Sequence, residues 1–573
     1  MTLKELRLKA GFTQEECAKV LNISLRTYNS YENNETKINS SKYNKYCKIL
    51  REKLSIEDNV SKLDNFHTNV MIGNQLNSSI ELVKKFKKRE CYTFLKQYLD
   101  EDYRGRICIL YGLRRTGKTT LLFQAISELP LNKTAYIKVT TSDNMGLLSK
   151  DLKALYQMGY SYVFIDEITL LEDFISTAAV LSDVFSIIGM KIVLSGTDSL
   201  GFAMADRDEL YDRNIMIRTS YISFKEYSTL LDIYSVDKYI EYGGTLKMEN
   251  MGFNDKDFAV EEVAFRNDES TRKYIDTAIS RNIQHTLKND NNGEYFNQLR
   301  ELYDAGELTN VINRIVEKMN HNFLLKVVEE RFKSHDLGSA KQLLLHDAPK
   351  ERATVLYDIN EEELLERLKA IIDVKEKNEL IIPITNAHIE KVKKYLVMLD
   401  LVQNCPSIIE SGGLEDNYIF IQPGMRYSIA KALVYSLMQD AYFNTISKED
   451  KDYIISKILN DVKGKMLEDI VLLETVKNFS DKKEVFKFKF DLGGEFDMVV
   501  LDKQSYEVCL YEIKHSNKIA KEQTKHLVNE EKCNLVERKF GKITHKYVLY
   551  TGKNSIVNGI EYLNVEEFLT NLK

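Results

Sequence analysis

The chain has 573 residues, 43% of them hydrophobic, and its 80 basic and 86 acidic side chains give a net charge of −6. A single hydrophobic core stops growing at roughly 250–300 residues, so several domains are expected. The slight excess of acidic side chains excludes a general affinity for nucleic acid, which must instead come from a local region.

The seven cysteines form no CxxC pair and have no nearby histidines at zinc-ligand spacing, so the common zinc patterns are excluded. No apolar run reaches the roughly 18 residues that a membrane span needs, and the first residues lack the apolar segment of a signal peptide. We therefore expect a cytoplasmic protein without a membrane segment.

Residues 1–56 contain the one basic region of the chain, because positions 1–53 hold eleven Lys or Arg and six Glu. Thr13 and Glu16 have the spacing of a capping box, and Ser24 can cap a second short helix that ends near Glu32. Two short helices joined by a tight turn predict an all-α helix-turn-helix domain.

The segment GFTQEECAKVLNISLRTYNSYENN resembles the helix-turn-helix of the Cro and phage-repressor type. Two departures are that Leu25 stands where a hydrogen-bonding side chain is usual, and that Asn34 replaces the usual glycine. The alternative is a helical bundle that contacts proteins. DNA binding is implied by the resemblance, with Gln14 on a phosphate, Leu25, Arg26, Asn29 and Ser30 facing the major groove, and Tyr28 and Tyr31 in the core.

Residues 57–98 are expected to form a polar linker followed by an amphipathic helix. The basic run from Lys84 to Arg89 favours a solvated face of that helix.

Residues 99–245 contain an apolar strand, 107–111, directly before a GxxxxGK[ST] sequence and an apolar-periodic helix. This context predicts a P-loop, in which Lys118 reaches the terminal phosphates of ATP and Thr119 binds Mg²⁺. A second strand ends in Asp166, expected to complete the magnesium site, and Glu167, expected to activate the attacking water. The third strand ends in Ser195, Thr197 and Asp198, and either Ser195 or Thr197 is a candidate γ-phosphate sensor, with ordinary turn chemistry as the alternative. The nucleotide-binding candidates are Gly112, Arg115, Thr116, Gly117, Lys118, Thr119, Thr120, Asp166 and Ser195.

Alternating strands and helices predict an α/β domain with a parallel sheet. GLRRTGKTTLL, YVFIDEI, LSGTDS, YDRNIMIRTSYISFKEY and YIEYGG follow the order found in the archaeal ATPase family and its bacterial AAA-type relatives. The sequence departs from that family at Asp212, where a glycine is usual, and at Thr245, where a Phe-Pro pair is common. These departures leave the trans-acting arginine open among Arg207, Arg213 and Arg218, and a homo-oligomer is expected.

Residues 246–375 are charged and predicted to be helical, without a catalytic constellation. Their histidines His321, His335 and His346 share no spacing, which favours solvated or capping roles. Residues 376–440 pair a helical pattern, containing Ile389, Val392, Tyr395, Leu396 and Leu399, with the strand NYIFIQPG. A winged helix is predicted there, either as a DNA-binding element or as a connection between domains.

Residues 445–573 carry a helix with Glu468, then EVFKFKF, GGEFDMVVLD and CLYEIKHS, a helix, and a final strand HKYVLYT. The order resembles that of PD-(D/E)xK nucleases, which implies an α/β fold and a site made of Glu468, Asp497, Glu512 and Lys514. Carboxylates at strand ends can bind Mg²⁺ or Mn²⁺, and a lysine two residues after Glu512 lies on the same sheet face. Glu495 is a further candidate ligand, and Gln523 a candidate phosphate contact.

These domains together predict an ATP-dependent protein that binds and cleaves DNA. By analogy, such an arrangement suits bacterial defence or the maintenance of mobile elements. One alternative is a transcriptional regulator switched by ATP, whose nuclease-like domain is inactive. Another is a signalling ATPase that binds proteins.

Overall fold

A computed structural model describes residues 13–33, 66–246, 268–280, 297–333, 384–437, 448–479 and 482–572 as continuous stretches, with a few short pieces between them. The chain divides into two compact units, each with its own core. One contains residues 1–85, 103–107 and 122–194, and the other contains residues 86–102, 108–121 and 195–573.

The N-terminal domain has the two predicted helices, α2 (Gln14–Val20) and α3 (Leu25–Glu32). The predicted capping box is present, since Thr13 Oγ1 accepts from the Glu16 amide and the Glu16 carboxylate accepts from the Thr13 amide. Ser24 caps α3 as predicted. Tyr28 is fully buried and Tyr31 packs against the same small core, while Asn34 lies outside the described residues.

A six-stranded sheet has the order β1-β3-β4-β5-β2-β6. Its strands are β1 (Asn69–Ile72), β2 (Ile107–Tyr111), β3 (Thr134–Lys138), β4 (Tyr162–Asp166), β5 (Lys191–Gly196) and β6 (Asn214–Arg218). The β3–β4 and β4–β5 pairs are parallel, as predicted. The helices that follow successive strands are α7 (Lys118–Ile126), α8 (Met145–Gln157), α9 (Phe174–Thr177), α10 (Ser199–Asp208), α11 (Phe224–Leu231) and α12 (Val236–Tyr242).

The prediction of a polar linker and an amphipathic helix at residues 57–98 is wrong in part. Strand β1 lies inside it and pairs antiparallel with β3, so the sheet takes in a strand that precedes the predicted core. Helix α5 (Asn77–Val83) ends before the basic run, and α6 (Tyr92–Asp100) begins after it. Arg89 is buried and does not lie on a solvated helix face, because its guanidinium binds backbone carbonyls and a carboxylate inside the protein.

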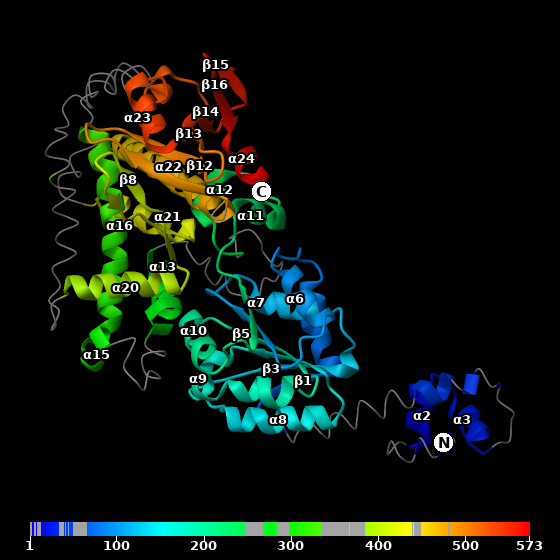
Figure 1. Cartoon of the computed structure of the whole chain (residues 1–573). Helices are drawn as coiled ribbons and strands as arrows, with labels where there is room; N and C mark the ends of the chain where they lie inside the picture. Colours follow the sequence, from blue (N-terminus) through cyan, green and yellow to red (C-terminus); the bar gives the residue numbers. More distant parts are fainter. Residues whose placement is uncertain are drawn as a thin grey trace. The chain divides into compact units, whose positions relative to one another are not determined.

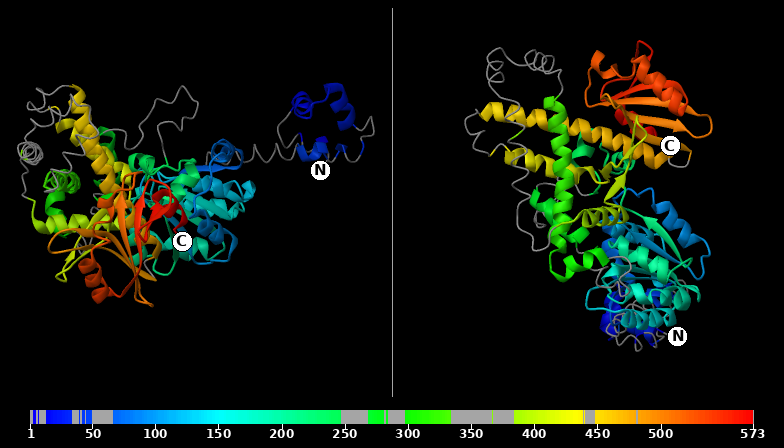
Figure 2. Two further views of the ribbon diagram at one scale, coloured as in Figure 1. Left: turned by 90° about the horizontal axis from the view of Figure 1, so that it is seen from above. Right: turned by 60° about the vertical axis from the view of Figure 1, so that its left-hand side comes forward.

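The middle of the chain is helical where it is described, with α13 (Asp268–Ile275), α15 (Asn297–Asp304) and α16 (Leu308–Lys333). His321 is buried within α16, contrary to the solvated or capping role predicted for it, whereas His335 and His346 lie outside the described residues. Helix α16 packs against α21 (Pro423–Leu437) and α22 (Lys448–Phe479), and Figure 2 shows it in green crossing the yellow helices.

The segment predicted as a winged helix contains α20 (Asn386–Met398), with Val392, Tyr395 and Leu396 buried as predicted. Strands β7 (Val402–Asn404) and β10 (Tyr418–Phe420) form a separate antiparallel pair. Between them, β8 (Ser407–Ile409) pairs parallel with β11 (Lys483–Lys489), and β9 (Leu414–Glu415) pairs with β8. This segment therefore contributes two strands to the C-terminal sheet, so the predicted boundary near residue 440 does not separate two independent sheets.

The C-terminal sheet has eight strands in the order β15-β16-β14-β13-β12-β11-β8-β9 (Figure 1). The four predicted strands are β11 (Lys483–Lys489), β12 (Glu495–Asp502), β13 (Glu507–Lys514) and β14 (Lys542–Tyr550). The strand predicted to be final is followed by β15 (Ser555–Val557), β16 (Ile560–Asn564) and α24 (Val565–Asn571).

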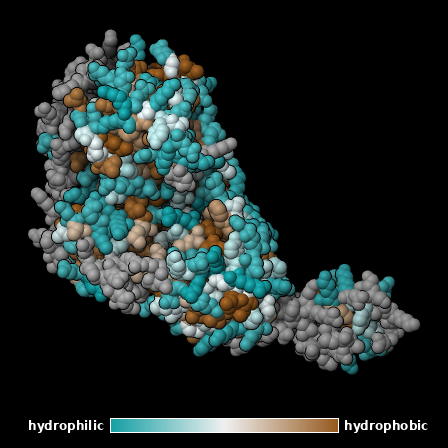
Figure 3. Space-filling model, viewed as in Figure 1, coloured by the Kyte–Doolittle hydropathy of each residue, from teal (hydrophilic) through white to brown (hydrophobic). Residues whose placement is uncertain are grey.

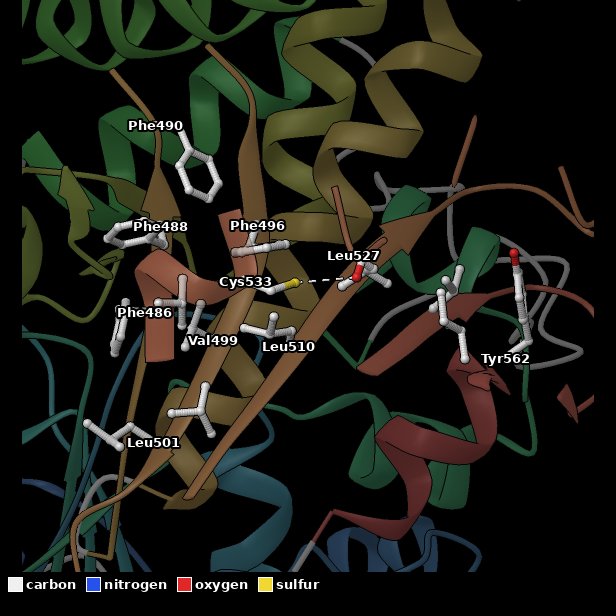
Figure 4. Close-up of a cluster of buried hydrophobic side chains, with 14 of the residues drawn as sticks. Phe486, Phe488, Phe490, Phe496, Val499, Leu501, Leu510, Leu527, Cys533 and Tyr562 are labelled. Carbon is white, nitrogen blue, oxygen red and sulfur yellow. Dashed lines mark hydrogen bonds between the residues drawn. The ribbon is translucent and has the colours of Figure 1, made fainter. Parts of the chain in front are cut away.

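The core of this sheet is apolar and rich in phenylalanine. Figure 4 shows Phe486, Phe488, Phe490 and Phe496 gathered near Cys533 of α23 (Glu530–Phe540). Helix α22 packs on β11, β12 and β13, which places its residues beside the strands that carry the predicted acidic site.

None of the described helices is long and apolar enough to cross a membrane. The face seen in Figure 3 is mainly hydrophilic, with separate apolar patches among polar side chains.

Candidate functional site

The P-loop connects β2 to α7 and bends back on itself at positions where the backbone needs glycine. Gly112 has φ +144°, and a Cβ there would lie 2.6 Å from Ser220 Oγ and 2.7 Å from Thr219 Oγ1. Gly117 has φ +86°, and Arg115 adopts a left-handed φ of +64°. Lys118 Nζ donates 2.8 Å hydrogen bonds to the carbonyls of Gly112 and Leu113. The loop therefore has the curled backbone that a phosphate cradle requires.

Three predicted threonines lie at the end of the loop and the start of α7. Thr116 is buried, and its hydroxyl donates to the Leu113 carbonyl and lies 3.0 Å from the Thr219 hydroxyl. Thr119 is exposed and Thr120 is half-buried. Thr116 thus stabilises the loop, whereas Thr119 has the exposure that a metal ligand needs.

The buried side chain of Arg89 binds the backbone of this loop. Its guanidinium donates to the carbonyls of Thr116 (2.8 Å) and Thr219 (2.6 Å), and to both carboxylate oxygens of Glu226 (2.9 and 2.7 Å). Burial alone lowers the pKa of Arg89, but the Glu226 carboxylate raises it above its ordinary value. This role was not predicted, because Arg89 ends a run that contains several exposed lysines.

Asp166 ends β4, as predicted, and is 1% exposed. Its Oδ2 accepts hydrogen bonds from the Tyr136 hydroxyl (2.8 Å) and from Lys138 Nζ (2.9 Å). Burial and then the Asp166 carboxylate raise the pKa of Tyr136, which therefore stays a hydrogen-bond donor. Glu167 follows in a left-handed conformation, φ +61°, so the chain turns sharply directly after Asp166.

The polar residues that follow β5 have different roles. Ser195 is buried near the end of β5. The Thr197 carbonyl, directly after the strand, accepts a hydrogen bond from Asn282 Nδ2 at 2.9 Å. Asp198 caps α10 through the Gly201 amide. Turn chemistry therefore accounts for Asp198, while the sensor role of Ser195 or Thr197 stays a prediction.

The candidate trans-acting arginines are not equivalent. Arg218 Nε donates to the Tyr111 hydroxyl (3.1 Å) and lies 3.0 Å from Asp400 Oδ2, so it already has an internal partner. Arg213 is exposed and donates to the Glu209 carbonyl. The Arg207 side chain lies outside what the structure describes. Asp212 has φ +57°, which explains why glycine is usual at this position.

The helix-turn-helix presents its predicted DNA-binding residues unequally. Arg26 is exposed on α3, whereas Asn29 and Ser30 are half-buried. Gln14 Nε2 donates to Glu32 Oε2 at 2.7 Å, so a phosphate contact by Gln14 would compete with an internal hydrogen bond. Arg26 is therefore the most accessible of the four candidates.

The C-terminal domain brings Asp497, Glu512 and Lys514 together, as the sequence predicted. Lys514 Nζ lies 2.8 Å from Asp497 Oδ2 and 2.8 Å from Glu512 Oε2. Burial opposes ionisation of Asp497, but Lys514 and Lys487 keep its pKa below its ordinary value. Burial and then the Asp497 carboxylate raise the pKa of Glu512 to about 8. The two acids thus repel each other, and the Lys514 ammonium between them offsets part of that repulsion.

Glu468 and Glu495 complete the acidic group. Carboxylate oxygens of Glu468, Glu495 and Asp497 all lie within 4.8 Å of one another. Two lysines that the sequence analysis missed, Lys465 and Lys487, also lie here and contact both glutamates. The Phe-Lys-Phe alternation of β11 was the available signal, because it turns Lys487 away from the phenylalanine core.

Gln523 does not face a ligand. It is buried in a short 3₁₀ turn (Lys521–Thr524), where its amide donates to the Lys518 carbonyl and accepts from the Ala520 amide. Gln523 therefore holds the loop after β13, and its predicted phosphate contact would break both hydrogen bonds.

These residues fit the implied groups to different degrees. The glycine cradle with Lys118 and Thr119 fits a nucleotide phosphate with Mg²⁺. At the C-terminal site, no donor lies within hydrogen-bond distance of the buried Glu512 Oε1, which leaves that oxygen available to a cation beside Asp497. The other side of Asp497 already holds ammonium groups, so the residues fit one divalent ion better than two.

Comparisons with known proteins identify two of these domains. Residues 3–56 match the family described as helix-turn-helix, and residues 104–228 match the family described as AAA domain. No curated protein sequence matches the chain. The chain thus carries a helix-turn-helix and an AAA-type P-loop domain, followed by a further α/β domain.

Solved structures with partial similarity include the S. cerevisiae Hsp104–ADP complex, at 12% identity over 69% of this chain and 48% of that chain, with a TM-score of 0.21. C. elegans PCH-2 matches at 14% identity over 41% and 64%, with a TM-score of 0.19. Aeropyrum pernix ORC1 in complex with DNA matches at 14% identity over 64% and 98%, with a TM-score of 0.20. The chain spans about half the length of the Hsp104 chain, and scores this low support no conclusion about function.

Arg89→Met should destabilise the protein by about 3–5 kcal/mol, because it leaves the buried Glu226 carboxylate without its cation. The double variant Arg89→Met/Glu226→Met should recover much of that stability. Its nucleotide affinity should remain below that of the wild type, because the loop carbonyls have lost their hydrogen-bond donor. Thermal melting and nucleotide titration measure the two effects. Lys84→Met, which removes an exposed charge from the same run, is the control. Equal melting temperatures for Arg89→Met and Lys84→Met would contradict the role of Arg89.

Proposed function

We propose that this chain is an ATP-dependent DNA-binding protein, in which the AAA-type domain binds and hydrolyses ATP and the helix-turn-helix reads DNA. The observation that carries the proposal is the P-loop backbone, curled at Gly112 and Gly117 directly before Lys118, within a region that matches an AAA domain. The match of residues 3–56 to a helix-turn-helix supplies the DNA-binding part. Cytoplasmic location and assembly into a homo-oligomer belong to the same proposal.

In the proposed ATPase site, Lys118 binds the terminal phosphates, and the Thr119 hydroxyl and Asp166 carboxylate hold the magnesium ion. When bound, Mg²⁺ offsets negative charge on the phosphates. Glu167 accepts a proton from the attacking water. Lys138 and Tyr136 orient the Asp166 carboxylate through hydrogen bonds to its Oδ2. Ser195 or Thr197 senses the γ-phosphate.

In the proposed DNA interface, α3 faces the major groove. Arg26 contacts bases, Asn29 and Ser30 contribute where their half-buried side chains reach, and Gln14 contacts a phosphate. The excess of eleven basic over six acidic side chains in residues 1–53 attracts the DNA backbone, although the whole chain has a net charge of −6. The winged-helix segment at 376–440 is a second candidate DNA contact or a connection between domains.

A metal-dependent nuclease is the second candidate activity, and it rests on the contacts of Lys514 with Asp497 and Glu512. Asp497 and Glu512 would hold one Mg²⁺ or Mn²⁺, with Glu468 as a further ligand of the same region. A bound ion supplies Lewis acidity toward a phosphodiester. Lys514 offsets charge on the scissile phosphate. A role in defence or mobile-element maintenance fits a nucleotide-controlled nuclease, whereas a transcriptional regulator fits an inactive one.

Lys118→Ala should abolish nucleotide binding, whereas Glu167→Gln should bind ATP normally and hydrolyse it about 10²–10⁴-fold more slowly, because a proton acceptor is lost. ATP titration and phosphate release measure the two steps. Glu172→Gln, which changes an exposed acid in the following turn, should behave as wild type. Hydrolysis by Glu167→Gln at the wild-type rate would show that another residue activates the water.

Arg26→Ala should change which DNA sequences are selected from a random pool, because this side chain is expected to contact bases. Lys19→Ala removes the same charge from the exposed face of α2, and should weaken binding to all sequences alike. Deletion of residues 1–55 should remove selection and reduce the salt dependence of binding. Unchanged selection after that deletion would assign DNA reading to another part of the chain.

Asp497→Ala and Glu512→Ala should abolish metal-dependent cleavage of DNA, and Lys514→Ala should lower the cleavage rate more than the metal affinity. Incubation of plasmid and linear DNA with Mg²⁺ or Mn²⁺, with and without ATP, measures cleavage. Glu507→Ala at the exposed start of β13 is the matched control. Cleavage that survives Asp497→Ala would place the site elsewhere, and the absence of any cleavage by wild type would favour the regulator.

A further inference from the structure

Lys487 occupies an unusual position in β11. The pairing of β11 with β12 shifts register between Phe486 and Phe488, where Asp497 and Met498 of β12 lie opposite Lys487 alone, so β12 carries the extra residue of a β-bulge. Its two neighbours in sequence belong to the phenylalanine core, while its own side chain is only 8% exposed. The regular alternation of β11 places the Lys487 side chain on the sheet face opposite the phenylalanine core, where its ammonium group meets the acidic side chains.

The Lys487 ammonium lies among three carboxylates. Its Nζ is 2.6 Å from Glu495 Oε1, 3.1 Å from Glu468 Oε2 and 4.0 Å from Asp497 Oδ1. The same three side chains are the ones whose oxygens lie close enough together to hold a metal ion. The position of a divalent ion in this group is therefore the position that the ammonium already occupies.

Lys465 adds a second cation at the edge of the same group. Its Nζ is 2.9 Å from Glu468 Oε2 and 3.4 Å from Glu495 Oε1. With Lys514, three ammonium groups face the four carboxyl groups of Glu468, Glu495, Asp497 and Glu512, so the group carries at most one net negative charge, when all four acids are ionised. Two divalent ions would place a large excess of positive charge in a buried site, which is unfavourable.

The carboxylate on the other side of Asp497 is arranged differently. Glu512 is 3% exposed; Lys514 Nζ lies 2.8 Å from its Oε2, whereas its Oε1 has no donor within hydrogen-bond distance. A buried carboxylate oxygen without a donor is costly unless a cation or proton reaches it. This side of the site retains an oxygen ligand that the lysines do not satisfy.

We propose that Lys487 is a built-in cation that takes the place of a divalent ion among Glu468, Glu495 and Asp497, and that the domain holds one divalent ion, between Asp497 and Glu512. The inference rests on the proposed metal site but not on cleavage activity. Glu468 and Glu495 then position Lys487, and this role replaces the ligand role proposed above for Glu468.

Equilibrium dialysis of the full-length chain against Mn²⁺, without nucleotide, tests the inference. Every protein carries Asp166→Asn, so that the ATPase site contributes no ion. The reference protein should bind one Mn²⁺, which Glu512→Ala removes. Lys487→Met should bind a second Mn²⁺, because three carboxylates lose their resident cation, and adding Glu495→Gln should abolish this second site. Lys487→Arg should bind one ion, as the reference does.

Thermal melting gives a second readout that does not depend on activity. Lys487→Met should melt at a lower temperature than the reference in EDTA and regain stability in Mn²⁺, since the ion replaces the ammonium. Lys487→Gln keeps hydrogen-bond donors and serves if Lys487→Met does not fold. The inference is overturned if the reference binds two ions, or if neither Lys487→Met nor Lys487→Gln gains a site. A reference that binds no ion refutes the metal site at Asp497 and Glu512 proposed above, while a gain in Lys487→Met would still support the role of Lys487.

Discussion

The buried pair of Arg89 and Glu226 determines how the P-loop is connected to the rest of its unit. One guanidinium binds carbonyls at the end of the P-loop and after β6, while its carboxylate partner lies on α11. The amide of Phe224, the first residue of α11, donates to Glu474 on α22, the helix that also carries Glu468. Burial raises the pKa of Glu474 to about 8, so this carboxyl is largely protonated at neutral pH. A continuous series of polar contacts therefore joins the P-loop to the helix beside the C-terminal acidic site.

The C-terminal domain shows how charge balance limits what a fold can do. Its acids are arranged as a metal site requires, yet three lysines neutralise most of their charge. Lys514 was expected from the sequence, because its spacing from Glu512 places both side chains on one sheet face. Lys487 and Lys465 were not expected, and under the inference above they limit the number of divalent ions that the site can hold. The identity of the acids alone is thus a poor guide to the number of metals.

Local sequence patterns predicted most elements that depend on neighbouring residues. Capping by Thr13 and Ser24, the strand before the P-loop and the end of β4 at Asp166 follow from helix-capping and strand rules that act over a few positions. Features that depend on distant partners were missed. Strand β1 is recognisable only through its pairing with β3, β8 only through β11, and the burial of Arg89 only through Glu226, which lies 137 positions away. The alternation of β11 indicates which sheet face Lys487 takes, but its ion pairs depend on Glu468 of α22 and Glu495 of β12, which have no signature in β11 itself.

Nucleotide bound at the P-loop is proposed to change the affinity of this chain for DNA. Fluorescence anisotropy can measure the affinity of the full-length protein for a selected DNA duplex, at one fixed salt concentration, without nucleotide, with ADP, and with a non-hydrolysable ATP analogue. The analogue should change the DNA affinity several-fold relative to the nucleotide-free protein, and Lys118→Ala should abolish the change. Equal affinities in all three states, in a protein shown to bind the analogue, would contradict this proposal.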